Sequence, residues 1–184
     1  DLMDNVITMV RSPMEQHHHN FHVRISKIEH EDVCGDSLRI QQLLTNILSN
    51  AIKYTPEGGD ITFYLSELSS SNTDLGCYEF IVQDNGIGMT QEFQDVMFEP
   101  FTRADDKRTT NVQGTGLGMA IAQNIAAMMN GHIKVESQPG AGSKFTVTIY
   151  LKQRNKIHDK LGKLITLPVL VVDDDPYSCE NTVA

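Results

Sequence analysis

The sequence is poor in cysteine and in positive charge, and both shortages limit what the protein can do. Its three cysteines, Cys34, Cys77 and Cys179, are far apart and lack the paired spacing of a metal site. This pattern fits a reduced, cytosolic compartment. The 15 lysines and arginines are outnumbered by 24 aspartates and glutamates, which gives a formal net charge of -9. So acidic a chain is a poor candidate for binding nucleic acid or an anionic membrane surface, and an anionic ligand would need local donors.

Long hydrophobic runs are also missing. No apolar run approaches the roughly 18 residues that a membrane span needs, and no signal peptide is recognisable. We therefore expect a cytoplasmic domain, while a longer parent chain could carry a membrane anchor elsewhere. The 184 residues, 40% hydrophobic and 21% charged, have room for one well-cored domain with appendages.

The spacing of apolar residues predicts a mixture of helices and strands. Residues 2–10 have helical spacing, which Pro13 interrupts, and residues 36–54 form a long amphipathic pattern with Asp36 or Ser37 as its cap. Strand-like segments are residues 21–25, 61–67, 78–86, 132–138 and 144–151. Short connections join the later strands in pairs, which implies antiparallel pairing. The predicted fold class is α+β, with a mixed, mostly antiparallel sheet covered on one face by helices.

Three glycines at alternate positions, Gly114, Gly116 and Gly118, precede another helical segment. Glycines at a helix N-terminus let backbone N–H groups approach an anion such as phosphate. A flexible hinge is the alternative, because the spacing matches neither the G-x-G-x-x-G nor the Gly-Lys-Ser/Thr signature.

The predicted helix at residues 36–54 carries a polar stripe beside its apolar one. The members of the stripe lie three or four residues apart and share one helix face: Arg39, Gln42, Asn46, Asn50 and Lys53. Amide oxygens can ligate a hard cation such as Mg²⁺, and a lysine can meet a phosphate. An ordinary solvated helix face is the alternative.

A carboxylate and two glycines follow a predicted strand in the segment QDNGIGM. Asp84 could accept a hydrogen bond from an exocyclic amine, while Gly86 and Gly88 let a flat ring approach the backbone. A simple Asp-Asn-Gly turn is the alternative. The polar stretch that follows, residues 90–113, is typical of a ligand-covering lid or of a disordered loop, and Arg103 within it could reach a terminal phosphate.

Four segments in succession, NILSNAIKYTPEGG, DNGIGM, FEPF and GTGLGMAIA, closely resemble the nucleotide-binding boxes of sensor histidine kinases. The resemblance covers roughly residues 21–151. It implies a two-layer α/β sandwich of the Bergerat type, the ATP-binding fold that histidine kinases share with gyrase-type topoisomerases, mismatch-repair ATPases and heat-shock chaperone ATPases. It also implies ATP and Mg²⁺ as cofactors.

The resemblance implies a role for each residue at the phosphate end of such a site. Asn50 would ligate Mg²⁺, and Asn46 would support the metal and the phosphates. Lys53 would face the phosphates, and Arg103 would sense the terminal one. The glycine-led segment would cradle the triphosphate through Gly114, Thr115, Gly116, Leu117 and Gly118.

The same resemblance implies how the adenine end is built. Tyr54 would pack against the adenine ring, and Asp84 would accept a hydrogen bond from its amino group. Gly86 and Gly88 would line the pocket for the base.

The flanks resemble other parts of this family. Residues 1–20 look like the end of a dimerisation helix, residues 21–152 like the catalytic ATP-binding domain, and residues 153–167 like a linker. Residues 168–184 look like the truncated start of a receiver domain. We therefore expect a fragment of a hybrid kinase. Its partners would be the dimerisation and histidine phosphotransfer domain of the same protein and a receiver domain or response regulator, with homodimers confined to the full-length parent.

The implied reaction is delivery of the γ-phosphoryl group of Mg-ATP to a histidine on a separate segment. The chain contains no H-E-x-x-x-P motif, so none of its seven histidines is a credible phosphoacceptor. The alternative is a conformational ATPase of the gyrase or chaperone type. Those enzymes resemble this chain but place a glutamate general base where Asn46 stands, and an amide cannot take a proton. A third class, a module that uses the fold only for protein contact, would not bind ATP.

Overall fold

Helix α2 (Ser37–Tyr54) begins and ends where its sequence predicts. The computed structural model describes residues 2–26, 28–70, 72, 74–103 and 115–154. Asp36 is the N-cap of α2, and its Oδ1 accepts a hydrogen bond from the N–H of Arg39 at 3.1 Å. The whole predicted apolar stripe is buried: Ile40, Leu43, Leu44, Ile47, Leu48 and Ala51.

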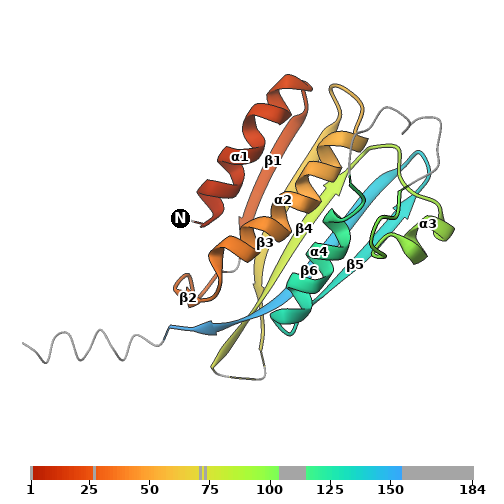
Figure 1. The fold of residues 1–184 in the computed structure, drawn as a ribbon. Coiled ribbons are helices and arrows are strands. Elements are labelled where there is room, and N and C mark those ends of the chain that lie inside the picture. Colours follow the sequence, from red (N-terminus) through yellow and green to blue (C-terminus); the bar gives the residue numbers. More distant parts are fainter. Residues whose placement is uncertain (1, 27, 71, 73, 104–114, 155–184) are drawn as a thin grey trace, which may run out of the picture. The chain divides into compact units, whose positions relative to one another are not determined.

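Six strands form one mixed sheet (Figure 1). They are β1 (Asn20–Ser26), β2 (Val33–Cys34), β3 (Asp60–Leu68), β4 (Leu75–Asp84), β5 (His132–Gln138) and β6 (Gly142–Gln153). The strand order is β1-β3-β4-β6-β2, and β5 also pairs with β6. Strand β1 runs parallel to β3, while the β2–β6, β3–β4, β4–β6 and β5–β6 pairs are antiparallel. The predicted mixed, mostly antiparallel sheet is confirmed.

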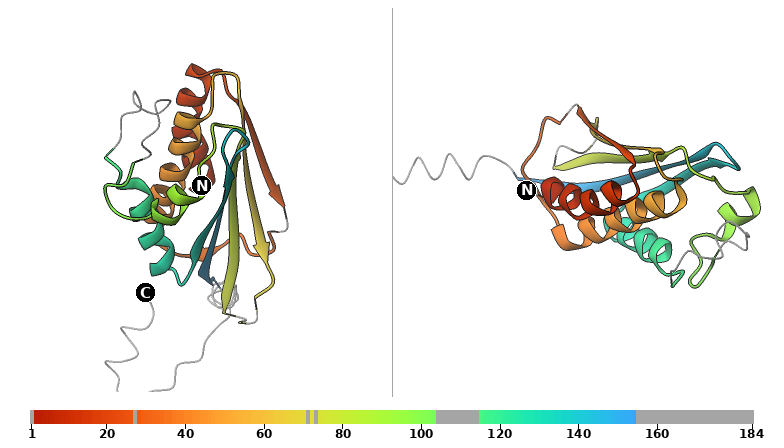
Figure 2. Two further views of the ribbon diagram at one scale, coloured as in Figure 1. Left: turned by 90° about the vertical axis from the view of Figure 1, so that its right-hand side faces the viewer. Right: turned by 90° about the horizontal axis from the view of Figure 1, so that it is seen from above.

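Three helices cover one face of this sheet: α1 (Leu2–Gln16), α2 and α4 (Gly118–Met128), as the view from above shows (Figure 2). A shorter helix, α3 (Gln91–Val96), follows β4. The core lies between the two layers, where Leu43 and Ile47 of α2 and Phe63 of β3 are fully buried. The predicted two-layer sandwich with helices on one face is therefore confirmed.

Helix α1 continues through Pro13, whereas the sequence predicted an interruption there. A proline inside a helix removes one backbone hydrogen bond and crowds the preceding turn. Val6, Val10 and Met14 lie on either side of the proline in sequence and are all buried in the shared core. Their burial offsets the cost of the proline. Helix α1 packs against α2 and shares the buried core, and its assignment to a dimerisation helix stays a prediction.

Strand β1 differs from its prediction in burial. The alternation of Phe21, Val23 and Ile25 predicted a half-buried strand, but Val23 is 37% and Ile25 is 53% exposed. Both side chains lie on the helix-covered face, because they pair in register with the buried Phe63 and Leu65 of β3. Strand β1 is at the edge of the sheet, which leaves these side chains partly open to solvent.

Some predictions fall outside the described residues. These are Gly114, residues 104–113 of the proposed lid, residues 155–167 of the proposed linker and the receiver-like residues 168–184. Within the described part, no helix has the length and apolar character needed to cross a membrane.

Candidate functional site

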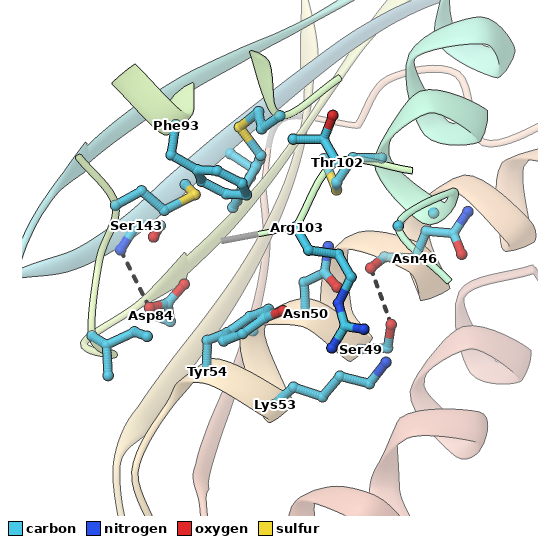
Figure 3. A pocket seen from close by; sticks show the side chains of 18 of the residues that line it. Asn46, Ser49, Asn50, Lys53, Tyr54, Asp84, Phe93, Thr102, Arg103 and Ser143 are labelled. Carbon is cyan, nitrogen blue, oxygen red and sulfur yellow. Dashed lines mark hydrogen bonds between the residues drawn. The ribbon is translucent and has the colours of Figure 1, made fainter. Parts of the chain in front are cut away.

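Helix α2 contributes one wall of a pocket with a volume of about 240 Å³ (Figure 3). Asn46, Asn50 and Lys53 of the predicted polar stripe line this pocket, and so does Tyr54, which the resemblance implied. The stripe is not used along its whole length, because neither Arg39 nor Gln42 lines the pocket. Near the start of the helix, the Nε of Arg39 forms an ion pair with Asp36 at 3.3 Å.

Asp84 lies at the end of β4 and is only 7% exposed. Its Oδ1 accepts two backbone hydrogen bonds, from the N–H of Gly86 at 2.8 Å and from the N–H of Ser143 at 3.2 Å. Burial raises the pKa of this carboxyl above its ordinary value, and the two N–H groups oppose the rise only in part. Both N–H groups donate to the same carboxylate oxygen, Oδ1. The carboxylate is thus fixed in place as an acceptor at the pocket wall (Figure 3).

Gly88 lines the pocket, and for two reasons only a glycine fits at this position. Its φ of +64° is in the left-handed region, and a Cβ there would lie 1.8 Å from the carbonyl oxygen of Gln138. Gly86 is not itself a lining residue. It lies directly behind the wall, where a Cβ would meet the carbonyl oxygen of Tyr54 at 2.4 Å.

The glycine-led segment is only partly within the described residues. Thr115, Gly116 and Gly118 line the pocket, whereas Leu117 is the N-cap of α4 and does not. Gly116 has a φ of +71°, and a Cβ there would collide with the backbone of Phe101. This tight approach is accompanied by a hydrogen bond from the N–H of Phe101 to the carbonyl of Gly116 at 3.0 Å.

The pocket has opposite electrical character at its two ends. Lys53 and Arg103 bring cationic groups to the region near Asn46 and Asn50, while the carboxylate of Asp84 lies on another wall (Figure 3). The buried Nδ2 of Asn46 has no hydrogen-bond partner in the described structure. Because an unpaired buried donor is costly, this amide is suited to an acceptor that a ligand would bring, such as a phosphate oxygen. The arrangement fits a ligand with an amino group at one end and anionic groups at the other.

Several lining residues were not predicted from the sequence. The apolar ones are Ile87, Met89, Phe93, Met97, Met119 and Phe145. Ser143 is the most informative omission, because its N–H positions Asp84 from a strand 59 residues further along the chain. Its place after a glycine-rich turn was visible in the sequence, but no local signal linked that turn to the carboxylate.

The fold agrees with what known proteins show. The chain belongs to the family of histidine kinase-, DNA gyrase B- and HSP90-like ATPases, which matches residues 35–153. Named relatives point to one branch of that family. The chain is 37% identical over 129 residues to the sensor histidine kinase GacS of Pseudomonas protegens, an alignment that covers 70% of this chain and 14% of that protein.

The signal transduction histidine-protein kinase BarA of Escherichia coli is similarly related. It is 35% identical over 149 residues, which cover 81% of this chain and 16% of BarA. The chain therefore spans a small part of the length of either relative. These similarities confirm the resemblance to sensor histidine kinases and give no support to the gyrase or chaperone branch.

Solved structures give the same answer for the fold. The catalytic domain of the histidine kinase ThkA matches with a TM-score of 0.65 and 26% identity, covering 80% of this chain and 89% of that one. The mycobacterial sensor histidine kinase MprB matches with a TM-score of 0.66, covering 83% of this chain and 97% of that one, at 22% identity.

Proposed function

We propose that this chain binds ATP together with Mg²⁺ and delivers the γ-phosphoryl group to a histidine on a separate dimerisation segment. One observation carries the proposal. A buried carboxylate, an asparagine with an unpaired buried amide and two cationic side chains line a single pocket in a chain of this ATPase family.

At the adenine end, Asp84 accepts a hydrogen bond from the amino group of the base. Its burial makes the charged carboxylate costly in the free protein, and a donor from the ligand lowers that cost. Tyr54 packs against the base, and Gly88 lets the base approach the backbone. Gly86 supports this end indirectly, since its N–H fixes the carboxylate.

At the phosphate end, Lys53 and Arg103 neutralise phosphate charge, with Arg103 at the terminal group. The residues present fit a metal as well. The side-chain oxygen of Asn50 is a suitable ligand for Mg²⁺, which would supply charge neutralisation during transfer. The Nδ2 of Asn46, which has no hydrogen-bond partner among the described residues, would donate to a phosphate oxygen. Backbone groups from Thr115 to Gly118, and the neighbouring Gly114, cradle the triphosphate.

Hydrolysis is not the proposed output. A conformational ATPase needs a general base to activate water, and Asn46 cannot accept the proton. Bound ATP should therefore persist in this chain until an acceptor histidine is supplied from elsewhere.

The parent protein is proposed to be a hybrid histidine kinase. Residues 1–20 would be the end of a dimerisation helix, and residues 168–184 would begin a receiver domain. The partners are then the dimerisation and phosphotransfer domain of the same protein and a receiver domain or response regulator.

Calorimetric titration with ATP and ADP in the presence and absence of Mg²⁺ tests the binding step. ATP at about 100 times its dissociation constant should stabilise the chain by about 2.7 kcal/mol. Arg103→Ala should weaken ATP binding by roughly tenfold and leave ADP nearly unchanged, because only ATP carries the terminal phosphate. No thermal shift at millimolar Mg-ATP would contradict the proposal.

The transfer step needs a separate assay. Adding a dimerisation segment with an acceptor histidine should give an acid-labile phosphoprotein, and Asn50→Ala should abolish its formation. Brisk hydrolysis by the isolated chain, lost in Asn46→Ala, would instead support the conformational ATPase.

A further inference from the structure

The connection between α1 and β1 places a buried histidine at the C-terminal end of α2, the helix that forms one wall of the pocket. Helix α1 ends in a Schellman motif, in which the N–H of His19 donates to the carbonyl of Met14 at 3.0 Å and the N–H of His18 to that of Glu15 at 3.1 Å. His18 takes the left-handed conformation that this motif requires, with a φ of 53°. The next side chain, His19, is turned into the protein and is 9% exposed.

His19 holds the end of α2. Its Nε2 lies 3.1 Å from the carbonyl oxygen of Thr55, the C-cap of that helix. Since a carbonyl can only accept, Nε2 must carry the proton and donate. The ring of His17 stacks on the His19 ring with centroids 5.5 Å apart. The orientation of the donor is thus set by both the helix end and the stack.

A second hydrogen bond joins this one in holding the C-terminal end of α2. The N–H of Ile87, in the loop that follows Asp84, donates to the carbonyl of Tyr54 at 3.0 Å. His19 donates to the next carbonyl along the chain, at Thr55. That last turn carries Lys53 and Tyr54 into the pocket, so its position decides where both side chains lie.

Further bonds join the same two connections. The N–H of Gly58 donates to the carbonyl of His17 at 3.1 Å, and the N–H of Asn20 donates to that of Gly59 at 2.9 Å. Asn20 Nδ2 donates to Asp60 Oδ1 at 3.0 Å. The other carboxylate oxygen of Asp60 accepts from Asn85 Nδ2 at 2.9 Å. The network therefore reaches the residue next to Asp84.

The histidine is a poor choice for stability alone. Its Nδ1 is buried without a hydrogen-bond partner in the described structure, and so is the hydroxyl of Thr55. An unpaired buried polar atom costs free energy, which offsets what the Nε2 hydrogen bond contributes. An apolar side chain of similar size would remove the unpaired Nδ1, but it would leave the buried carbonyl of Thr55 without its donor. We therefore expect such a change to lower the stability of the fold modestly.

We propose that His19 is a positioning residue for nucleotide binding, which holds the last turn of α2 so that Lys53 and Tyr54 meet the ligand. The inference rests on the proposed function of the pocket. It assigns to the α1–β1 connection, which does not line the pocket, a direct influence on affinity for ATP.

The test compares three variants of the whole chain by calorimetric titration with ATP in the presence of Mg²⁺, together with thermal unfolding. His19→Leu removes the donor and should weaken ATP binding by about tenfold, with some fall in melting temperature because the carbonyl of Thr55 loses its partner. His19→Gln keeps an N–H donor at the same distance along the side chain, so it should restore affinity to within about threefold of the original protein.

His30→Leu is the matched control. The Nδ1 of His30 also makes a hydrogen bond, at 2.7 Å to Glu67, but Glu67 pairs with Tyr78 near the end of the β3–β4 ladder remote from Asp84. This variant should lose stability and keep its ATP affinity. The inference is overturned if His19→Leu binds ATP normally, if glutamine fails to rescue, or if affinity falls only in proportion to stability in both histidine variants. Failure of the unsubstituted chain to bind ATP would instead overturn the proposed function.

Discussion

Asp84 and Glu67 are carboxylates near opposite ends of the β3–β4 ladder, and backbone N–H groups hold each in the same manner. At Glu67, the N–H groups of Glu29 and His30 donate to Oε2 at 2.7 and 2.8 Å. At Asp84, two N–H groups likewise donate to one oxygen, Oδ1. In both carboxylates, one oxygen accepts both backbone hydrogen bonds, and these bonds fix the position of the side chain.

The two carboxylates differ in the second oxygen. The Oε1 of Glu67 lies 2.7 Å from the Nδ1 of His30, whereas neither N–H group at Asp84 reaches Oδ2. The pKa values follow this difference. Burial alone would raise the pKa of Glu67, but the N–H groups and the ring of His30 outweigh it and lower the pKa. At Asp84, burial wins and the pKa is raised.

Under the proposed function, the second oxygen therefore separates a structural carboxylate, Glu67, from a binding one, Asp84. Where the protein itself supplies donors to both oxygens, the charge contributes to stability. Where it fixes one oxygen and leaves the other toward a pocket, the charge costs stability until a ligand donates to it. Four predictions test this separation.

Asp84→Asn should have the largest effect, because it replaces the second oxygen by an NH₂ group and keeps the first. An asparagine with its amide oxygen in the place of Oδ1 can still accept from both N–H groups, but it then presents a donor to the amino group of adenine. Affinity for ATP and ADP should fall alike, by about 100-fold or more, in calorimetric titrations. An unchanged affinity would show that Asp84 does not accept a hydrogen bond from an amino group of the ligand.

Glu67→Gln makes the corresponding change at the other carboxylate. It should lower the free energy of unfolding by about 1–3 kcal/mol in urea denaturation, because the hydrogen bond with His30 loses its charged partner. Affinity for ATP should stay within twofold. A large loss of affinity at unchanged stability would erase the distinction between the two carboxylates.

The two carboxyls should also give stability profiles of opposite slope. Because the pKa of Asp84 is raised from 3.8, its charged form costs stability as pH rises through the raised pKa. Over that pH range, the free energy of unfolding of Asp84→Asn should increase relative to that of the original chain. Because the pKa of Glu67 is lowered from 4.5, its contribution is complete above that value and is lost as pH falls through the lowered pKa. Unfolding curves between pH 3 and pH 7 measure both, and parallel profiles would contradict the pKa directions.

Tyr78→Phe should have the smallest effect. The hydroxyl of Tyr78 donates to the carbonyl of His30 at 2.7 Å and so supports the loop that holds Glu67. Its loss should cost about 0.5–1.5 kcal/mol with no change in nucleotide affinity. Burial, with the nearby charge of Glu67, raises the pKa of Tyr78 to about 12. The stability difference between the two proteins should therefore be complete below pH 10 and decrease as pH rises from 10 towards 12. Its absence at pH 8 would count against the hydrogen bond.

The parts of this molecule that the sequence predicts are those with local causes. The cap at Asp36 and the apolar stripe after it fix α2, and the position of Asn46 and Asn50 on its other face follows from helix periodicity. Asp84 could be placed at a strand end because the strand-like residues stand directly before it in the sequence.

Contacts between distant segments could not be predicted in this way. Helix α1 passes through Pro13 because the core buries residues on both sides, and no local pattern reports that core. Strand β2 is too short to leave a periodic signal and exists through its pairing with β6. Ser143 reaches Asp84 only because β6 and β4 lie side by side.

The close approach of Gly88 to Gln138 also has a consequence for the order in which the protein is made. The motif residues from Asn46 to Gly118 leave the ribosome before the hairpin of β5 and β6. Yet the carbonyl group against which Gly88 packs belongs to Gln138 of that hairpin, and the second N–H group that donates to Asp84 belongs to Ser143. A nascent chain that ends before it therefore carries every recognisable motif and still lacks a finished pocket. Nucleotide can act as a folding ligand only late in synthesis, after the hairpin has emerged.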